Sequence, residues 1–131
     1  MTFEGCKPWT ESGDAYEPEL LDGRRLWFHD MDLLRIELDP EARTVTFWFC
    51  CDRDAAPAEL VAVPVARLML HRARIVEWVE DPVEELPPGV GRQVNGMAFE
   101  APNLLLFDSL NLHLQIEIQH VSLAVLPAGA G

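Results

Sequence analysis

The chain has 131 residues, 49% of them hydrophobic, and a net charge of −12 at pH 7. This length suits one domain with a core of its own. The acidic charge argues against a nucleic-acid partner, which needs a basic surface, and no apolar run reaches the roughly 18 residues that span a membrane. The first six residues lack the basic and apolar regions of a secretory signal. We therefore predict a cytoplasmic protein with neither nucleic acid nor membrane as a partner.

The cysteines indicate reduced, structural thiols. Their number is odd, and two of the three, Cys50 and Cys51, are adjacent in the chain, where a disulfide is strained. No Cys-x-x-Cys pair or Cys/His spacing typical of a metal site is present. We predict no cofactor and no bound metal. Nine arginines against one lysine are typical of a GC-rich bacterial genome.

Residues 1–25 are rich in proline, glycine and acidic residues, which predicts an irregular lead-in. Its aromatic residues Phe3, Trp9 and Tyr16 are expected to attach it to the body of the domain. Regular structure is expected to begin after the turn signal Asp22-Gly23.

A β-hairpin is predicted next. Leu33–Leu38 and Thr44–Cys51 both alternate apolar with polar side chains, which is the period of a half-buried strand. The segment between them, residues 39–43, contains a proline placed for a turn. The β-branched and aromatic content of the second run supports a strand.

The central segment Leu60–Val79 predicts two strands joined by a tight connection or bulge near Arg72. As a helix, it would spread its charged residues around the circumference instead of forming a polar face, although the pattern leaves a partly helical segment as an alternative. Asp52–Glu59 is predicted to be a loop, and Asp81–Asn95, with its prolines and glycines, a long loop.

Unbroken alternation over Asn111–Gln119 is the clearest strand signal in the chain. Short apolar runs at Ala98–Phe99 and Leu104–Phe107 precede it. At His120 the phase shifts by one residue, and Val121–Leu126 continues on the new phase. A shift of this kind predicts a β-bulge or a new strand.

Together these elements predict one all-β domain over residues 1–131. About seven short, mainly antiparallel strands with polar turns are typical of a two-sheet sandwich or a partly open barrel. No internal repeat or low-complexity segment interrupts the pattern.

Two groups of residues have side chains suited to catalysis or metal binding. His29-Asp30-x-Asp32 combines an imidazole with carboxylates, but metal-dependent phosphohydrolases place a His-Asp pair on helices, and here strands surround it. A local structural role for His29 and Asp30, through hydrogen bonds to the backbone, is the favoured interpretation. His113 and Glu117 share the polar face of one strand and form the second group, as a base or a metal-binding pair.

Asp108, Ser109 and His113 have the residue types of a hydrolase triad. Neighbours along one strand point in alternating directions, however, and the chain lacks a Gly-x-Ser-x-Gly turn. It also lacks a P-loop and a dinucleotide-binding fingerprint.

Aromatic and acidic residues predict a surface for a protein partner. Most of the four tryptophans are expected in the core, but Trp48 lies on the face opposite Phe47 and Phe49, where it packs under a second layer or marks a contact. An acidic segment without basic residues runs from Glu77 to Glu85, and such a surface suits a basic partner. The predicted contact residues are Trp48, Glu77, Glu80, Asp81, His113, Gln115 and Glu117.

The segment Trp27–Asp39 places an aromatic-His-Asp opening before a strand, a turn and the second strand Thr44–Phe49. This arrangement resembles small bacterial β-proteins that include the immunity-protein-50-like family of polymorphic toxin systems. Leu68–Trp78 and Leu112–Leu126 would match the later strands of such proteins. The resemblance implies a non-enzymatic, cytoplasmic inhibitor that binds a cognate toxin.

We therefore expect a non-enzymatic protein-binding domain, of the immunity type where the resemblance applies, with a basic toxin domain as its partner. Electrostatic steering would speed such an association. Two alternatives stay open: a metal-dependent or hydrolytic enzyme built on either of the two groups named above, and a small-ligand-binding β-barrel. A homodimer formed through a sheet edge is a further expectation.

Overall fold

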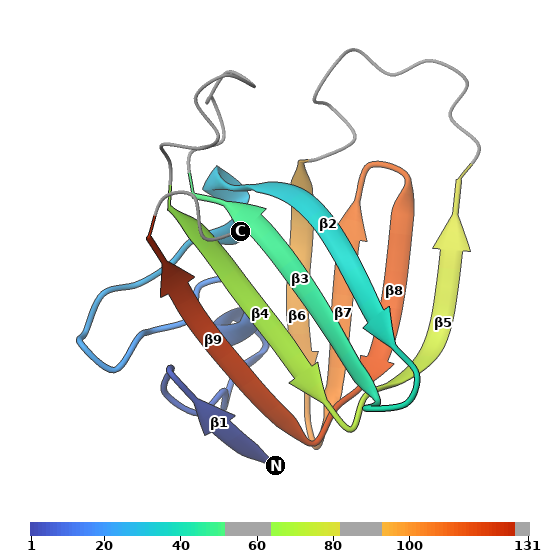
Figure 1. Ribbon diagram of the computed structural model, residues 1–131, viewed down its shortest axis with the longest axis horizontal. Helices are drawn as coiled ribbons and strands as arrows, with labels where there is room; N and C mark the ends of the chain where they lie inside the picture. Colours follow the sequence, from blue (N-terminus) through green and yellow to red (C-terminus); the bar gives the residue numbers. More distant parts are fainter. Residues whose placement is uncertain (52–63, 82–92, 128–131) are drawn as a thin grey trace.

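The computed structural model describes residues 1–51, 64–81 and 93–127, which form two mostly antiparallel β-sheets facing each other (Figure 1). The sheets do not close into a barrel, so the all-β prediction is confirmed as a sandwich. The described residues form nine strands where the sequence predicts about seven. In these ranges there is no helix of the length and apolarity that crossing a membrane requires.

The five-stranded sheet has the order β1-β9-β4-β3-β2, and all its neighbours are antiparallel except β1 and β9. Its strands are β1 (Thr2–Glu4), β9 (His120–Leu126), β4 (Val65–His71), β3 (Thr44–Cys50) and β2 (Asp32–Asp39). The four-stranded sheet has the order β5-β8-β7-β6 and is antiparallel throughout. Its strands are β5 (Arg74–Glu80), β8 (Leu112–Glu117), β7 (Leu104–Ser109) and β6 (Val94–Glu100).

The predicted hairpin consists of β2 and β3, and its turn is set by an aspartate. Asp39 Oδ1 accepts hydrogen bonds from the backbone N–H of Glu41 and of the residue after it, both at 3.1 Å. Strand β2 departs from the strict alternation expected of it, because its register shifts between Leu33 and Arg35. The residue between them is the extra residue of a β-bulge, which bends the strand.

Both changes of phase predicted from the sequence are crossings between the sheets. The described part of Leu60–Val79 is two strands, β4 and β5, and Arg72 lies in the connection with a φ of 50°. The shift at His120 is a new strand, since β8 ends at Glu117 and β9 returns to the five-stranded sheet. Both crossings lie at the same end of the sandwich (Figure 1).

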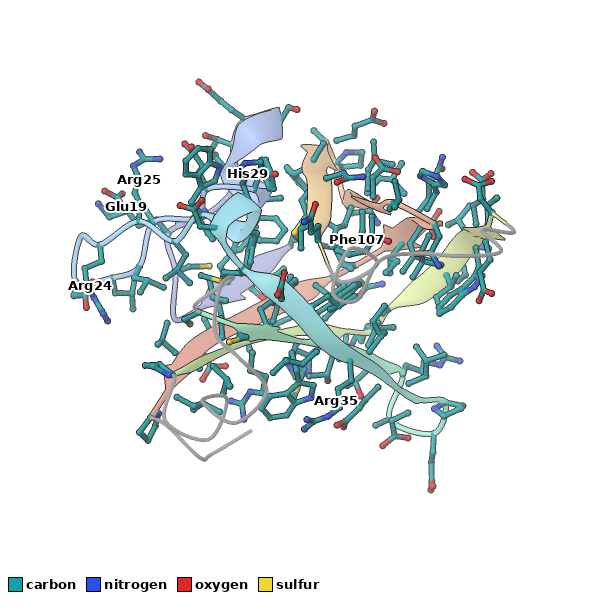
Figure 2. The ribbon with its side chains drawn as sticks, turned by 90° about the horizontal axis from the view of Figure 1, so that it is seen from above. Glu19, Arg24, Arg25, His29, Arg35 and Phe107 are labelled. Atoms are coloured by element: carbon teal, nitrogen blue, oxygen red, sulfur yellow. The ribbon has the colours of Figure 1, made fainter. Side chains whose placement is uncertain are left out.

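Aromatic rings join the two sheets in the core. Phe47 of β3 and Phe107 of β7 are fully buried, and their ring centroids lie 5.0 Å apart. Phe49 extends the cluster toward Phe28, at a centroid distance of 4.5 Å. Figure 2 shows Arg35 on the far side of the five-stranded sheet from Phe107. Core side chains therefore fill the space between the sheets, where a barrel would hold its ligand.

The lead-in is more regular than predicted. It contributes β1 and the 3-10 helix η1 (Ser12–Ala15), and a bridge joins Cys6 to Leu20. A second 3-10 helix, η2 (Phe28–Asp30), follows just before β2. The pairing of β1 with β9 thus attaches residues 1–25 to the sandwich in addition to the expected aromatic contacts, and the Cys6–Leu20 bridge joins two parts of the lead-in.

The expectation that most of the tryptophans lie in the core is wrong. Trp9 is buried, with the rings of Phe3 and Phe99 at 5.4 and 5.8 Å, but Trp27 and Trp78 are 45% and 41% exposed. Trp78 is exposed because β5 is an edge strand that is solvent-accessible along nearly its whole length.

Cys6, Cys50 and Cys51 are thiols, as predicted. Burial raises the pKa of Cys6 and of Cys51 to about 11, so both thiols stay protonated at neutral pH and neither is a ready nucleophile. The predicted loop Asp52–Glu59 and most of Asp81–Asn95 lie outside the described residues.

Candidate functional site

The outer face of the four-stranded sheet displays the polar residues predicted for β8. Because side chains alternate along a strand, β8 points Leu114 and Ile116 into the core. Its outward residues are His113, Gln115 and Glu117. Their partners across the sheet are Asp108, Leu106 and Leu104 on β7, and Val79, Glu77 and Arg74 on β5. Three strands therefore contribute carboxylates to one face.

His113 is held between two of these carboxylates. Its Nδ1 lies 2.5 Å from Asp108 Oδ1, and its Nε2 lies 3.0 Å from Asp81 Oδ2. With an acceptor at each ring nitrogen, the imidazolium is the protonation state that satisfies both contacts. The hydrogen bonds to Asp108 and then to Asp81 raise the pKa of His113 above its usual 6.5.

Strand β5 combines exposed apolar side chains with acidic ones. Val76, Trp78 and Val79 are 48%, 41% and 38% exposed. Trp78 Nε1 donates a hydrogen bond to Glu80 Oε1 at 2.8 Å, which holds the indole ring at the surface. Among the described strands β5 pairs only with β8, so its other edge is open.

Glu117 has a different partner from His113. The two residues are four positions apart on one strand, which separates them by about 13 Å. Glu117 forms a bidentate pair with Arg74, whose Nε and Nη2 lie 3.0 and 2.9 Å from the carboxylate oxygens. Gln115 lies between the two, opposite Glu77. His113 and Glu117 are therefore too far apart to share a metal ion or a reacting atom.

Trp48 lies on the outer face of the other sheet. Its cross-strand partners are Arg35 on β2 and Arg67 on β4, whose Cζ atoms lie 4.4 and 6.0 Å from the ring centroid in cation–π geometry. The Trp48 Nε1 atom is buried and, among the described residues, has no hydrogen-bond partner. Trp48 is therefore separated from the predicted acidic contact residues by the thickness of the sandwich.

The His29-Asp30-x-Asp32 group lies at the start of β2. His29 Nδ1 is 3.0 Å from the Tyr16 hydroxyl, and its ring lies 5.0 Å from that of Trp27. The Asp30 backbone N–H donates to the Trp27 carbonyl at 3.0 Å, and Asp32 is buried. In the part of the chain that the structure describes, no three His, Cys, Asp or Glu side chains are arranged to hold a metal ion.

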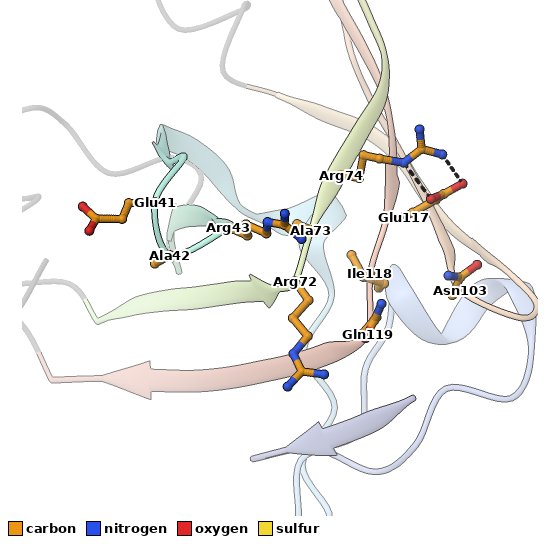
Figure 3. Close-up of a pocket in the computed structure, with 10 residues that line it drawn as sticks. All are labelled: Glu41, Ala42, Arg43, Arg72, Ala73, Arg74, Asn103, Glu117, Ile118 and Gln119. Carbon is orange, nitrogen blue, oxygen red and sulfur yellow. Dashed lines mark hydrogen bonds and ion pairs between the residues drawn. The ribbon is translucent and has the colours of Figure 1, made fainter.

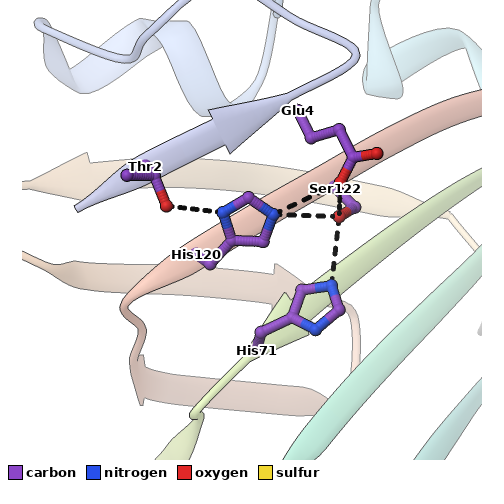
Figure 4. Close-up of polar contacts among 5 residues, drawn as sticks. All are labelled: Thr2, Glu4, His71, His120 and Ser122. Atoms are coloured by element: carbon purple, nitrogen blue, oxygen red, sulfur yellow. Dashed lines mark hydrogen bonds and ion pairs between the residues drawn. The ribbon is translucent and has the colours of Figure 1, made fainter.

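A polar cluster missed by the sequence analysis lies on the outer face of the five-stranded sheet (Figure 4). Ser122 Oγ is 3.0 Å from His71 Nε2, 3.3 Å from His120 Nε2 and 3.2 Å from Glu4 Oε2. Thr2 Oγ1 is 2.6 Å from His120 Nδ1. The sequence could have indicated only that His120 and Ser122, two residues apart on one strand, share a face. Their partners come from β1 and β4, which are distant in the sequence.

The cluster has the residue types of a catalytic triad without its arrangement of protons. The Ser122 hydroxyl donates its hydrogen bond to Glu4. Its contacts with His71 and His120 are satisfied when the Ser122 oxygen accepts from the Nε2–H of each ring. Neither imidazole then accepts the serine proton, so the hydroxyl is not activated as a nucleophile. Ser122 is also paired on both sides, with Glu4 and Met69, so its own backbone N–H faces a neighbouring strand and not a bound oxyanion. The cluster ties β1 to the sheet.

We expect the pKa of His71 to lie below the ordinary 6.5 and the pKa of His113 to lie above it. Burial, and then the neighbouring His120, lower the pKa of His71, whereas carboxylates raise that of His113. The contacts of His113 therefore stabilise the fold below pH 6.5, and this effect is lost as the pH rises through its raised folded pKa. His71 has the opposite effect, since the fold loses stability as the pH falls from 6.5 through its lowered folded pKa.

Histidine side-chain NMR measures both values. Asp108→Asn should lower the pKa of His113, because Asp108 contacts the His113 ring. The pKa of His71, on the other sheet, should stay unchanged. An unchanged titration of His113 in this variant would contradict the carboxylate contact. The same spectra report which ring nitrogens are protonated, and so test the tautomers assigned around Ser122.

The predicted contact residues thus divide between two faces of the sandwich. Glu77, Glu80 and Asp81 lie along or just after β5, with His113 beside them, and Trp48 lies on the other sheet. No family model, curated protein or solved structure matches this chain.

Proposed function

We propose that this chain is a non-enzymatic protein-binding domain that docks a basic partner through β5 and the acidic face beside it. One observation carries the proposal: the exposed edge strand β5 brings Val76, Trp78 and Val79 to the surface within five residues that also include Glu77 and Glu80. Exposed large apolar side chains in one place are uncommon on a surface and mark interaction sites. An aromatic anchor with a charged rim is the composition of a binding hot spot.

The open edge of β5 adds a second element of recognition. An extended segment of a partner can pair with such an edge, so that main-chain hydrogen bonds contribute affinity and side chains contribute specificity. The carboxylates of β5 favour a segment rich in lysine or arginine. Pairing two copies of β5 would place their carboxylates near one another, which is unfavourable. We therefore favour a basic partner over a homodimer at this edge.

The partner class that we propose is a basic toxin domain, which this chain would neutralise in the cytoplasm. The resemblance of Trp27–Phe49 to immunity-protein-50-like proteins supports this partner. The net charge of −12 supports it as well, since long-range attraction speeds association with a basic protein. Cysteines in the thiol form suit a reducing compartment. A toxin gene next to the gene for this chain is the expected genomic context.

The test is binding to the purified toxin domain encoded by that neighbour, measured by calorimetry. Trp78→Ala should weaken binding by about 2 kcal/mol, roughly 30-fold, as loss of a hot-spot anchor does. Trp27→Ala is the matched control, because it removes an indole that is similarly exposed, 45% against 41%, elsewhere on the surface. Its affinity should equal that of the unmodified chain.

Charge reversal separates steering from anchoring. Glu77→Lys should slow association, with an effect that shrinks as salt is added, and should change dissociation little. Equal losses from the two tryptophan variants, or an association rate indifferent to salt, would contradict docking through β5. A neighbouring gene product that binds but has no toxic activity would contradict the inhibitor role and leave the docking surface standing.

A further inference from the structure

A pocket of about 850 Å³ opens at the end of the sandwich where the chain crosses between the sheets (Figure 3). Its walls come from the turns of four strand pairs and carry the side chains of Arg43, Arg72 and Arg74, with Asn103 and Gln119. A volume of this size is in the range of small-molecule sites. Three arginines in the wall of one pocket contrast with the net charge of −12 of the whole chain.

Backbone hydrogen bonds between the turns hold this pocket in shape. The Ala73 N–H donates to the Arg43 carbonyl at 2.9 Å, and the Ile118 N–H donates to the Asn103 carbonyl at 2.9 Å. The third is donated by the Gln119 N–H, just before β9, to the His71 carbonyl at the end of β4, at 3.2 Å. Because each turn is fixed by another, the pocket is formed before any ligand arrives, and binding does not need to order it.

Arg43 and Arg72 are the uncommitted cations of the pocket. Arg74 is engaged by both carboxylate oxygens of Glu117. The guanidinium groups of Arg43 and Arg72 form no ion pair or hydrogen bond with other described residues. Glu41, the other acidic residue of the pocket wall, points away from all three arginines (Figure 3).

The backbone at both arginines is held in an unfavourable conformation. Arg43 and Arg72 have φ angles of 55° and 50°, the left-handed region, and no other non-glycine residue in the described ranges has a positive φ. A turn of this kind forms most easily with glycine or asparagine. Such conformations in other residue types cluster at ligand-binding sites, where the side chain is needed. Here both of them border the same pocket.

A second hollow of about 300 Å³ adjoins the pocket and shares Arg43, Ala73 and Arg74 with it. Its other walls are mainly apolar and include Leu38 and Ile75. Asp39 also lines it, and one oxygen of this carboxylate accepts the two backbone hydrogen bonds of the β2–β3 turn. Leu38 is 50% exposed although it lies on the core-facing side of β2. Cationic and apolar surfaces therefore meet at Arg43.

We propose that these adjoining hollows bind a small organic anion, with a phosphoryl or carboxylate head at Arg43 and Arg72 and a compact apolar body against Leu38 and Ile75. The planar fork of a guanidinium matches the two oxygens of either head group. The site goes beyond partner docking and uses only the start of β5, at the opposite end of the strand from Glu80. Loss of the toxin partner would leave it intact.

The test uses the complete chain and four defined probes, followed by calorimetry and by amide NMR. Phenylphosphonate and benzoate carry a head and a body, inorganic phosphate carries the head alone, and benzyl alcohol carries the body alone. Saturable binding of phenylphosphonate or benzoate is expected, and the tighter of the two identifies the head group. Inorganic phosphate should bind at least tenfold more weakly than phenylphosphonate, and benzyl alcohol should not saturate.

Glycine substitutions keep the test free of folding defects. Arg43→Gly and Arg72→Gly remove a guanidinium and place the residue best suited to a left-handed turn, so the fold should be retained. Each should weaken binding about tenfold or more, as loss of a charge-assisted hydrogen bond does. Arg24→Gln changes the net charge equally outside the pocket, where Arg24 pairs with Asp22, and should leave affinity unchanged.

Three results would overturn the proposal. The first is the absence of saturable binding by either head-and-body probe. The second is an equal loss of affinity in Arg24→Gln, which would assign the effect to overall charge. The third is equal affinity for inorganic phosphate and phenylphosphonate, which would remove the apolar hollow from the site.

Discussion

Replacing Phe107 by alanine is expected to lower the free energy of unfolding by about 3–5 kcal/mol. Phe107 is fully buried, and its ring lies against that of Phe47 from the opposite sheet, with 5.0 Å between centroids. The substitution removes buried apolar surface and leaves a cavity where the sheets meet. Ladder hydrogen bonds fix the strands on each side, so the cavity cannot collapse fully. A domain with a total stability of about 5–15 kcal/mol loses a large share of it.

Urea denaturation followed by tryptophan fluorescence measures this loss. Phe107→Leu is the control, because it keeps most of the volume and should cost less than about 1.5 kcal/mol. A double-mutant cycle with Phe47→Leu isolates the ring pair itself, for which a coupling of about 0.5–1.5 kcal/mol is expected. An alanine variant that loses no more than the leucine variant would show that the two sheets do not depend on this contact.

Gly5→Ala is expected to release β1 from the five-stranded sheet. Gly5 has a φ of +82°, and a Cβ atom added there would lie 1.9 Å from the backbone oxygen of Leu123 on β9. The left-handed backbone alone costs an alanine about 1–2 kcal/mol, and the overlap with a backbone atom adds to this cost. Because β1 is only three residues long, it cannot absorb the shift while staying paired.

Gly23→Ala separates the two causes. Gly23 has a similar φ of +91°, but an added Cβ would meet no atom within 4 Å. This variant should therefore lose only the backbone cost, about 1–2 kcal/mol. Hydrogen exchange gives a second measure, since the amides of β9 that face β1 should lose protection in Gly5→Ala alone. Equal stability losses in the two variants would show that the close approach to Leu123 has no effect.

Strands with a strong local pattern were predictable from the sequence. The hairpin of Leu33–Cys51 and the strand inside Asn111–Gln119 follow from period-two alternation, because one face of each is buried against the other sheet. The phase shift at His120 was predictable as an irregularity. The crossing from one sheet to the other at this point could not be predicted, because a phase shift alone does not say which strands will be neighbours.

For the candidate site, the sequence predicted which residues share the outer face of β8 but not all of the contacts that they make. Alternation placed His113 on the outside of a strand, and Asp108, at the end of β7, is near it in the sequence. Its other contact, Asp81, comes from just after β5, and no local pattern connects it with His113. The arginine pocket was not predictable for the same reason, since four separate turns build it. Trp78 was misassigned because hydrophobicity predicts burial, whereas an edge strand lacks a neighbour to cover it.

The placement of β1 has a consequence for solubility. A strand edge with unpaired backbone groups recruits strands from other molecules. Among the described strands, it is β1 that covers the outer edge of β9, where Thr2–Glu4 pairs with His120–Ser122. Val121 lies in that stretch of β9 and is buried. A chain that has lost its first few residues, by proteolysis or by truncation, presents this edge to other copies, and intermolecular pairing there leads to aggregation.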